Sequence, residues 1–228
     1  MINDKYALNQ KAVTELSKYL KSLREKGGLS LRELGYYSDV TAIALGAIEK
    51  NKTLIPRLET VLRLIDYWQF SDEQIMEIYT AFCNKDKKLT IIDKEVAPKD
   101  RKVSLNETEL NNINTYFRNE RKERKLKQIE IKNIIGIPVT HLSRFETGHE
   151  SYSLLTLIPL CNFYEVKPEQ VVDYYHRVFN KEGDSETINL DFLSRDELIQ
   201  IILKQNSTSN RFYSVKRGKI KTLQKVNY

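Results

Sequence analysis

The 228-residue sequence predicts an all-α fold made of two tandem five-helix domains, followed by a C-terminal helix and a basic tail. Apolar residues recur at helical spacing along most of the chain, as in Ile131, Ile134 and Ile135. Stop signals separate these runs; Gly136, for example, can adopt the left-handed conformation that ends a helix and turns the chain. The whole pattern occurs twice, and its period is that of a domain.

The second occurrence of the pattern follows the first at a nearly constant distance. Arg121 and Glu146 lie 97 positions after Arg24 and Glu49, and the distance becomes 96 beyond a turn that is one residue longer in the first occurrence. A two-step offset of this kind indicates an internal duplication. The predicted parts are a first domain at 1–84, a linker at 85–104, a second domain at 105–180, and a C-terminal helix with a basic tail at 181–228.

The helices of the first domain follow from their start and stop signals. Gly27 and Gly28 end the first helix, and Ser30 with Glu33 forms a capping box at the start of the second. In the linker, residues 89–92 are expected to form either a short strand or a packed arm. The five helices are predicted near 8–27, 30–37, 41–50, 57–69 and 72–84.

The second domain has matching signals and one exception. Asn106 and Glu109 are spaced as a capping box for its first helix, whereas Pro159 should kink the fourth helix or delay its start. Its helices are predicted near 106–124, 127–135, 138–147, 153–165 and 168–180. A further helix is expected near 194–205, and the tail beyond it is either a small basic hairpin turning at Gly218 or disordered.

Positive charge is concentrated toward the end of the chain. Lysine and arginine total 37 against 31 acidic residues, and residues 198–228 include seven basic residues and no acidic one. Lys216, Arg217 and Lys219 belong to this tail, and a second basic cluster spans 118–127. Such clusters suit a polyanion, because they neutralise phosphates and release counterions. The alternative is a solvated tail and an ordinary basic helix end.

The sequence lacks the features that are typical of several classes of protein. No apolar run has the ~20 residues that a membrane span needs, and the first residues contain no secretory signal. Cys83 and Cys161 stand in apolar helical settings without a metal-binding spacing, which indicates reduced core thiols in a cytoplasmic protein. The sequence has three histidines, no phosphate-cradling glycine loop and no paired carboxylates, so we expect no enzyme activity, metal, cofactor or small-molecule ligand.

The repeated pattern resembles a known family of DNA-binding regulators. The spacing of Gln128, Gly136 and Arg144 between Arg121 and Glu146 is similar to that of the Cro/CI-type, or XRE, helix-turn-helix family of bacterial and phage regulators. The resemblance implies two lambda-repressor-like domains, each with a helix that can enter the DNA major groove. It further implies a sequence-specific transcriptional regulator, or a phage or mobile-element repressor, that binds double-stranded DNA as a homodimer.

The family has an ion pair at two of these positions. By this resemblance, Arg24 pairs with Glu49 and Arg121 pairs with Glu146. Each pair ties the first helix of its domain to the end of the helix that enters the groove. The expected role is structural, and desolvation of the charges offsets much of their attraction.

In the second domain, the resemblance implies a base-reading surface. Val139, Thr140 and Arg144 are expected to reach base edges, because arginine can bond bidentately to guanine and methyl groups suit thymine. Gln128 is expected at a phosphate. The remaining predicted DNA contacts are His141, Ser143 and Thr147, with Lys127, Lys216, Arg217 and Lys219 supplying positive charge.

The equivalent surface of the first domain has different chemistry. Ala42, Ile43 and Ala47 replace the base-reading residues, Leu31 replaces the glutamine, and Gly46 adds a further small residue. A small apolar face offers few hydrogen bonds to bases and usually marks a protein contact. It is either a dimerisation or partner surface, or a DNA surface that reads shape and thymine methyls. The first option keeps open a rival function, a protein-interaction module such as an anti-repressor or an inhibitor of a nucleic-acid enzyme.

Overall fold

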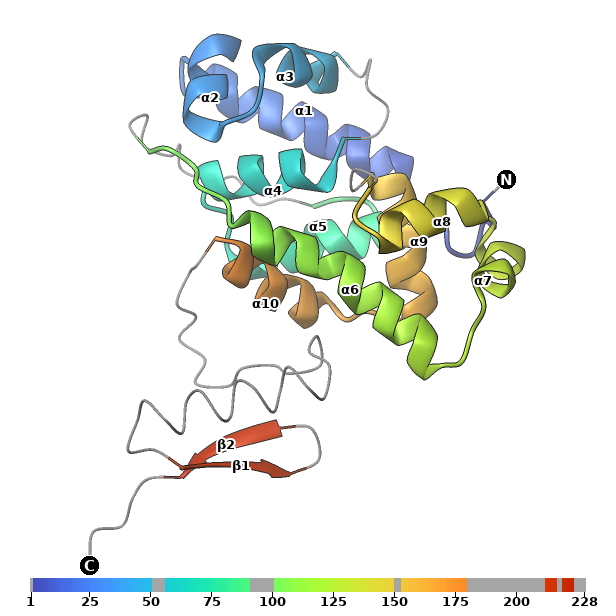
Figure 1. Cartoon of the computed structure of the whole chain (residues 1–228). Helices are drawn as coiled ribbons and strands as arrows, with labels where there is room; N and C mark the ends of the chain where they lie inside the picture. The colour runs from blue at the N-terminus through green and yellow to red at the C-terminus, as the bar shows by residue number, and fades with distance from the viewer. Residues whose placement is uncertain are drawn as a thin grey trace, which may run out of the picture. The chain divides into compact units, whose positions relative to one another are not determined.

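The computed structural model describes residues 2–50, 56–90, 101–149 and 153–179, together with the backbone of two strands near the C-terminus. Residues 1–180 form one compact unit and residues 181–228 form a second (Figure 1). The described part of the first unit contains ten helices. They are α1 (Gln10–Lys26), α2 (Leu31–Ser38), α3 (Ala42–Glu49), α4 (Leu58–Tyr67), α5 (Asp72–Cys83), α6 (Glu107–Glu123), α7 (Gln128–Ile135), α8 (Val139–Glu146), α9 (Leu154–Tyr164) and α10 (Pro168–Val178).

These helices confirm those predicted from the sequence between residues 8 and 180, and the observed ends differ from the predicted ones by at most two residues. Local capping explains this agreement. The Ser30 hydroxyl accepts the Glu33 N–H at 3.2 Å, and the Glu33 carboxylate accepts the Ser30 N–H at 2.8 Å. α7 ends at Gly136, whose φ of 90° lies in the left-handed region that favours glycine.

Two runs of five helices share several backbone features; we call residues 2–90 the first half and residues 101–179 the second half. In each half, the N–H of the residue that caps the first helix donates to a carbonyl at the end of the fifth helix. These donor–acceptor pairs are Asn9 with Phe82 at 2.9 Å and Asn106 with Val178 at 2.8 Å. Residues with positive φ also recur at matching positions: Gly28 and Lys125, Asp39 and Gly136, and Gln69 and Glu165.

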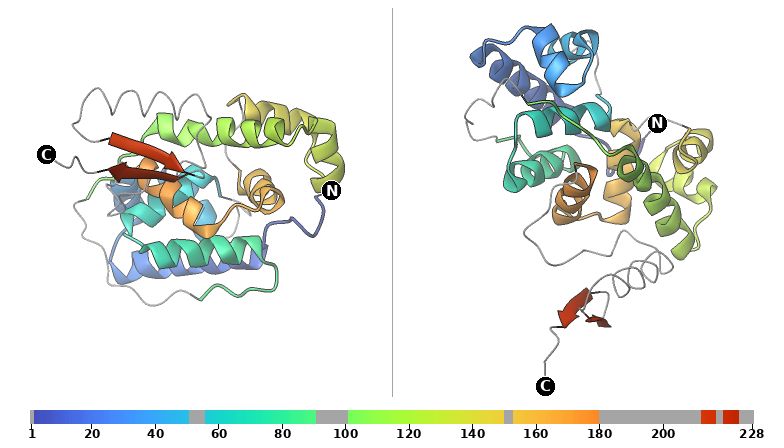
Figure 2. Two further views of the ribbon diagram at one scale, coloured as in Figure 1. Left: turned by 90° about the horizontal axis from the view of Figure 1, so that it is seen from below. Right: turned by 60° about the vertical axis from the view of Figure 1, so that its left-hand side comes forward.

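Each half buries an apolar core. α1 packs against α3 and α5 in the first half, as α6 packs against α8 and α10 in the second, and the left view of Figure 2 shows α1 and α5 side by side. The most deeply buried side chains include Leu16, Leu23 and Trp68 in the first half and Ile131, Ile135 and Phe145 in the second. No helix in the described ranges is long and apolar enough to cross a membrane.

The two halves contact each other mainly through their fifth helices. α5 packs along α10 and also against α9. The Tyr79 hydroxyl donates to the Val166 carbonyl at 2.7 Å, and the Tyr175 hydroxyl donates to Asp66 Oδ1 at 3.1 Å. Tyr79 and Tyr175 stand 96 positions apart, at matching places in the two runs, so each half sends the same side chain into the other. The division of the chain into two domains at 85–104 stays a prediction.

Each half contacts the segment that precedes the first helix of the other half. The Asn3 N–H donates to the carbonyl of Ile135, at the end of α7, at 2.7 Å. In the other direction, the N–H of the buried Val103 donates to the carbonyl of Tyr37, near the end of α2, at 2.8 Å. Backbone hydrogen bonds therefore link the halves in both directions.

Two local predictions can be compared with the structure. Pro159 lies inside α9, which starts at Leu154, so the proline does not delay the start of this helix. Leu89 is buried and its N–H donates to Glu15 Oε2 at 3.0 Å, as expected for a packed arm rather than a strand at that residue. Residues 91–100, which include the rest of the predicted arm, lie outside the described residues.

The second unit contains two described strands, β1 (Phe212–Lys216) and β2 (Lys219–Leu223). They pair in antiparallel fashion with Lys216 opposite Lys219. This hairpin matches one of the two alternatives drawn from the sequence and adds strands to a fold predicted to be all-α. The helix predicted near 194–205 lies outside the described residues.

Candidate nucleic-acid interface

A turn of three residues joins α7 to α8, and its sequence explains its shape. The Gly136 N–H donates to Lys132 O at 2.8 Å and closes α7. Pro138, with φ of −57°, directly precedes α8, where its fixed φ suits a helix start and its missing N–H has no intrahelical partner to lose. Ile137, between them, is buried and anchors the turn to the core.

Apolar side chains hold one face of α8 against the core. Leu142 and Phe145 are buried, and the Phe145 ring centroid lies 5.9 Å from that of Phe117 on α6. Ile131 and Ile135 on α7 are fully buried in the same core. Because Leu142 and Phe145 are three residues apart, they lie on one side of α8 and leave the opposite side facing outward.

An ion pair fixes the C-terminal end of α8. Arg121 donates from Nε to Glu146 Oε1 at 2.6 Å and from Nη2 to Glu146 Oε2 at 2.8 Å, which makes the pair bidentate. The remaining nitrogen, Nη1, donates to the Leu126 carbonyl at 2.9 Å. The hydrogen bond to Glu146 raises the pKa of Arg121. Since the Glu146 side chain is almost fully buried, loss of the arginine would leave a buried charge without its partner.

Gln128 joins this cluster from the start of α7. Its Nε2 donates to Glu146 Oε2 at 2.9 Å, and because a carboxylate can only accept, the amide nitrogen must face Glu146. Gln128 was expected at a phosphate and Glu146 in a separate ion pair, and the bond between them was not predicted. Their spacing along the chain carries no signal for this bond, which exists only because the turn brings α7 and α8 together.

The outward side of α8 carries the residues expected to read bases. Thr140, His141 and Arg144 are exposed, whereas Val139 and Ser143 are partly buried. Arg144 Nη2 donates to the carbonyl of His149 over 3.5 Å, a long bond that solvent or a ligand can replace. The Arg144 guanidinium therefore lies at the surface, on the side of α8 that faces away from the core.

The turn after α8 is shaped by Thr147. Its hydroxyl donates to the Ser143 carbonyl at 2.9 Å, and His149 Nδ1 lies 2.9 Å from Thr147 Oγ1. Gly148 has a φ of 73°, which lets the chain leave the helix. Thr147 was expected to contact DNA from this turn; its side chain is exposed, but its hydroxyl already serves the turn itself.

Exposed lysines precede the start of α7 in the chain. Lys122, Lys125 and Lys127 are all exposed. Glu130 is also exposed, and its carboxylate accepts the Lys127 N–H at 2.5 Å, so it offsets part of the positive charge. The start of a helix attracts anions through its free N–H groups and its dipole. Lysine side chains and a helix start thus occur together, as expected for a phosphate contact.

The predicted basic contacts of the tail belong to the second unit. Lys216 ends β1 and Lys219 begins β2, and the register pairs them directly. Arg217 lies between the strands, outside the described residues. Three basic residues therefore occur within four positions around the hairpin turn.

The acidic residues, histidines and cysteines of the described part of the chain are its possible metal ligands and nucleophiles. Within them, no three His, Cys, Asp or Glu side chains come together as a metal site. Cys83 and Cys161 are free thiols, and burial raises the pKa of both. Because the thiolate is the nucleophile and the metal ligand, this shift lowers the fraction of the reactive form at both cysteines.

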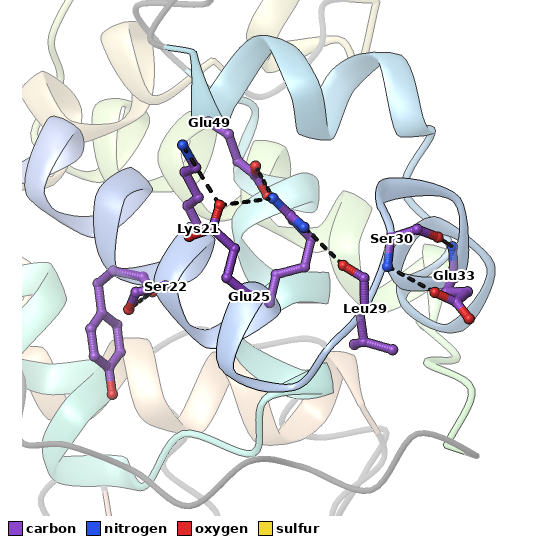
Figure 3. Close-up of polar contacts among 9 residues, drawn as sticks. Lys21, Ser22, Glu25, Leu29, Ser30, Glu33 and Glu49 are labelled. Atoms are coloured by element: carbon purple, nitrogen blue, oxygen red, sulfur yellow. Dashed lines mark hydrogen bonds and ion pairs between the residues drawn. The ribbon is translucent and has the colours of Figure 1, made fainter.

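The first half contains the equivalent ion pair, but no glutamine amide from α2 joins it. Arg24 donates from Nε to Glu49 Oε1 at 2.6 Å and from Nη2 to Glu49 Oε2 at 2.8 Å. Its Nη1 donates to the Leu29 carbonyl at 2.8 Å, and Figure 3 shows the contacts around Glu49 and Leu29. Leu31 stands at the position that Gln128 occupies in the second half, so Glu49 receives no amide from this site.

The outward side of α3 is small and apolar. Ile43 is 86% exposed, although an isoleucine side chain is normally buried. Ala42, Gly46 and Ala47 beside it are partly exposed. The hydroxyl of Thr41, at the start of the helix, accepts a backbone N–H of α3 at 3.2 Å. This side therefore offers apolar surface where α8 offers an arginine.

Comparison with known proteins finds a similarity in the second of these two regions. A family model described as helix-turn-helix matches residues 117–171, which run from α6 into α10 and include α7, α8 and α9. No curated protein and no solved structure was found to match the chain. Residues 117–171 are therefore similar to helix-turn-helix domains, the class of domain to which the XRE family belongs.

Proposed function

We propose that the chain is a sequence-specific, double-stranded-DNA-binding transcriptional regulator of the repressor type, acting in the cytoplasm. In this proposal, residues 1–84 and 105–180 are two tandem helix-turn-helix domains, and the second one reads the bases. The family match at 117–171 supports the assignment of the second domain. The recurring helix caps, positive-φ residues and Arg–Glu pairs support the assignment of the first.

The outward side of α8 is the observation that carries this proposal. Thr140 and Arg144 are exposed while Leu142 and Phe145 bind the helix to the core, so α8 can enter a major groove without rearrangement. Arg144 then bonds bidentately to the O6 and N7 atoms of a guanine. The methyl groups of Thr140 and Val139 contact thymine methyls, which gives further discrimination.

Gln128 supplies a contact to the DNA backbone. Its Nε2 carries two hydrogens, and only one of them is donated to Glu146. The second donates to a phosphate at the edge of the groove, where the charge of Lys127 adds to the attraction. Contacts of this kind fix the position of the protein on the duplex and carry no sequence information.

Selection from a randomised duplex library with the purified full chain tests the proposal. We expect the unchanged chain to enrich one sequence motif. The Arg144→Ala variant should enrich a motif whose base preference is weaker at one position. Ala47→Ser, at the matching position of the first half, is the control and should select the same motif as the unchanged chain. Failure of the unchanged chain to enrich any motif would contradict the proposal.

The exposure of Ile43 favours a second role for the first half. The fifth helices, α5 and α10, already pack against each other within the chain, whereas the apolar side of α3 faces outward. We propose that two chains meet through α3, in a homodimer that pairs this helix with its own copy. The rival function, an anti-repressor or an inhibitor of a nucleic-acid enzyme, uses the same surface for a different protein and predicts no enriched DNA motif.

A further inference from the structure

The last carbonyl groups of α7 are capped by a residue from the far end of the first half. The final carbonyls of an α-helix have no partner within the helix. Asn3 Nδ2 donates to the Ile134 carbonyl at 3.1 Å, across 131 positions of sequence, and the Asn3 N–H donates to the Ile135 carbonyl at 2.7 Å. Asn3 therefore provides two donors to consecutive carbonyls at the end of α7.

Asn3 is held in the conformation that this capping needs. Its Oδ1 accepts the Lys5 N–H at 3.0 Å and its carbonyl accepts the Tyr6 N–H at 3.0 Å, which closes a tight turn. The turn is attached to α9, where Asn162 Nδ2 donates to the Tyr6 carbonyl at 3.1 Å and the Phe163 ring meets the Tyr6 ring edge-on. An asparagine fits this place because one side chain must both donate and accept.

The capped carbonyls come directly before the turn into α8. Gly136 and Ile137 follow Ile135 in the chain, so a displacement of the last turn of α7 displaces the start of α8 as well. A binding surface needs its side chains held closely in the productive geometry by supporting contacts. In the first half, the Val103 N–H bonds the Tyr37 carbonyl at the corresponding end of α2, so both turns receive a donor from the segment before the other half's first helix.

We propose that Asn3 is a positioning residue for the base-reading side of α8. It holds the last turn of α7, fixes the turn at Gly136, and so keeps Arg144 in place for a base edge. The inference rests on the proposed function of α8 in DNA binding. Asn3 acts through the backbone of α7 and makes no contact with DNA itself.

Amide hydrogen exchange on the full chain tests the cap without DNA. Asn3→Ala should lower the protection of the Gly136 and Leu142 amides by about fivefold, within the range for one lost hydrogen bond. Asn3→Asp keeps an acceptor for the Lys5 N–H but cannot donate to Ile134, so it should lose protection to the same extent. Gln10→Ala, at an exposed amide on α1, is the matched control and should change nothing. Unchanged protection in Asn3→Ala would overturn the proposal.

Binding of the selected duplex tests the consequence for DNA. Asn3→Ala should reduce affinity for this duplex about three- to tenfold while affinity for a scrambled duplex stays the same, because a neutral residue that only positions α8 adds no phosphate contact. An equal loss of affinity for both duplexes would overturn the positioning role. The role would also be overturned if amide protection were lost while the ratio of the two affinities stayed the same. If the unchanged chain selects no duplex, the proposed function fails, and the exchange result alone decides whether Asn3 holds the turn.

Discussion

The amide of Gln128 donates to the carboxylate of Glu146 at 2.9 Å, across the turn between α7 and α8. The same carboxylate receives two hydrogen bonds from Arg121 on α6. One buried group therefore connects the end of α6, the start of α7 and the end of α8. In the first half, Leu31 replaces the glutamine, and Glu49 connects only the equivalent ends of α1 and α3.

Gln128→Ala should weaken binding to every duplex by a similar factor. The change removes a phosphate donor, and phosphate contacts position the protein without reading sequence. Arg121 still pairs with Glu146, so circular dichroism should show an unchanged fold. Titrations with the selected duplex and a scrambled one measure the two factors. A loss confined to the selected duplex would assign Gln128 to base reading instead.

Arg144→Ala should cost about 1–3 kcal/mol of binding free energy and relax the preference at one base pair, as expected for a lost bidentate contact. The side chain is exposed, so stability should change little. Titrations with duplexes changed at single positions measure the effect. Ala47→Ser is the control at the matching position on α3, and an equal loss of specificity in that variant would count against the assignment of base reading to α8.

The helices and their ends were predictable because their signals are local. Ser30 caps its helix through Glu33, three residues away, and Gly136 ends α7 through its own backbone conformation. The inward and outward sides of α8 were also predictable, since Leu142 and Phe145 recur at helical spacing. These features need only a short window of sequence, together with the resemblance to a known family.

The contacts that join remote segments were not predictable. Asn3 and Ile134 are 131 positions apart, and Gln128 and Glu146 are 18 apart. A hydrogen bond between such residues leaves no periodic trace in a single sequence. The packing of α5 against α10 was not predicted for a related reason: the spacing of apolar residues shows which side of a helix is buried but not which helix covers it.

The buried thiols should make stability depend on pH in alkaline solution. Burial raises the pKa of Cys83 from 9.0 to about 12, and burial raises that of Cys161 as well. Below pH 9 both the folded and the unfolded chain keep protonated thiols. Above it the unfolded chain ionises first, so the free energy of unfolding should fall as the pH rises from 9 toward 12.

Urea unfolding at several alkaline pH values measures this decline. Tyrosine and lysine side chains titrate in the same range, so the control is the double variant Cys83→Ala with Cys161→Ala. Its free energy of unfolding should fall less steeply with pH than that of the unchanged chain. Equal slopes would show that the thiols do not contribute.

Deleting residues 206–228 should weaken DNA binding regardless of sequence. The segment contains six basic residues and no acidic one, and its β1–β2 hairpin carries Lys216 and Lys219. Each lost phosphate contact should reduce the slope of log affinity against log salt concentration by about 0.9. The double variant Lys216→Gln with Lys219→Gln keeps the rest of the tail and should remove about two contacts. A slope that stays the same after the deletion would show that the tail does not bind DNA.

Introducing a charge on the outward side of α3 should separate a homodimer into single chains. Ile43 is 86% exposed and Ala47 is partly exposed, so glutamate at either position can reach water in a single chain. In a dimer built on α3, each new carboxylate would be buried near its own copy, where desolvation and repulsion both oppose association. Ile43→Glu and Ala47→Glu should therefore lower the mass measured by light scattering by half, with unchanged circular dichroism.

The control variant is Gln10→Glu, which adds the same charge at an exposed position on α1 and should leave the mass unchanged. DNA affinity distinguishes the two possible roles of α3, association of two chains and contact with DNA. If the glutamate variants become single chains and keep the base preference of α8, the first half serves association. If they keep the mass of the dimer but lose DNA affinity, the carboxylate must face phosphates, and α3 then lies in a groove so that both halves contact one extended site.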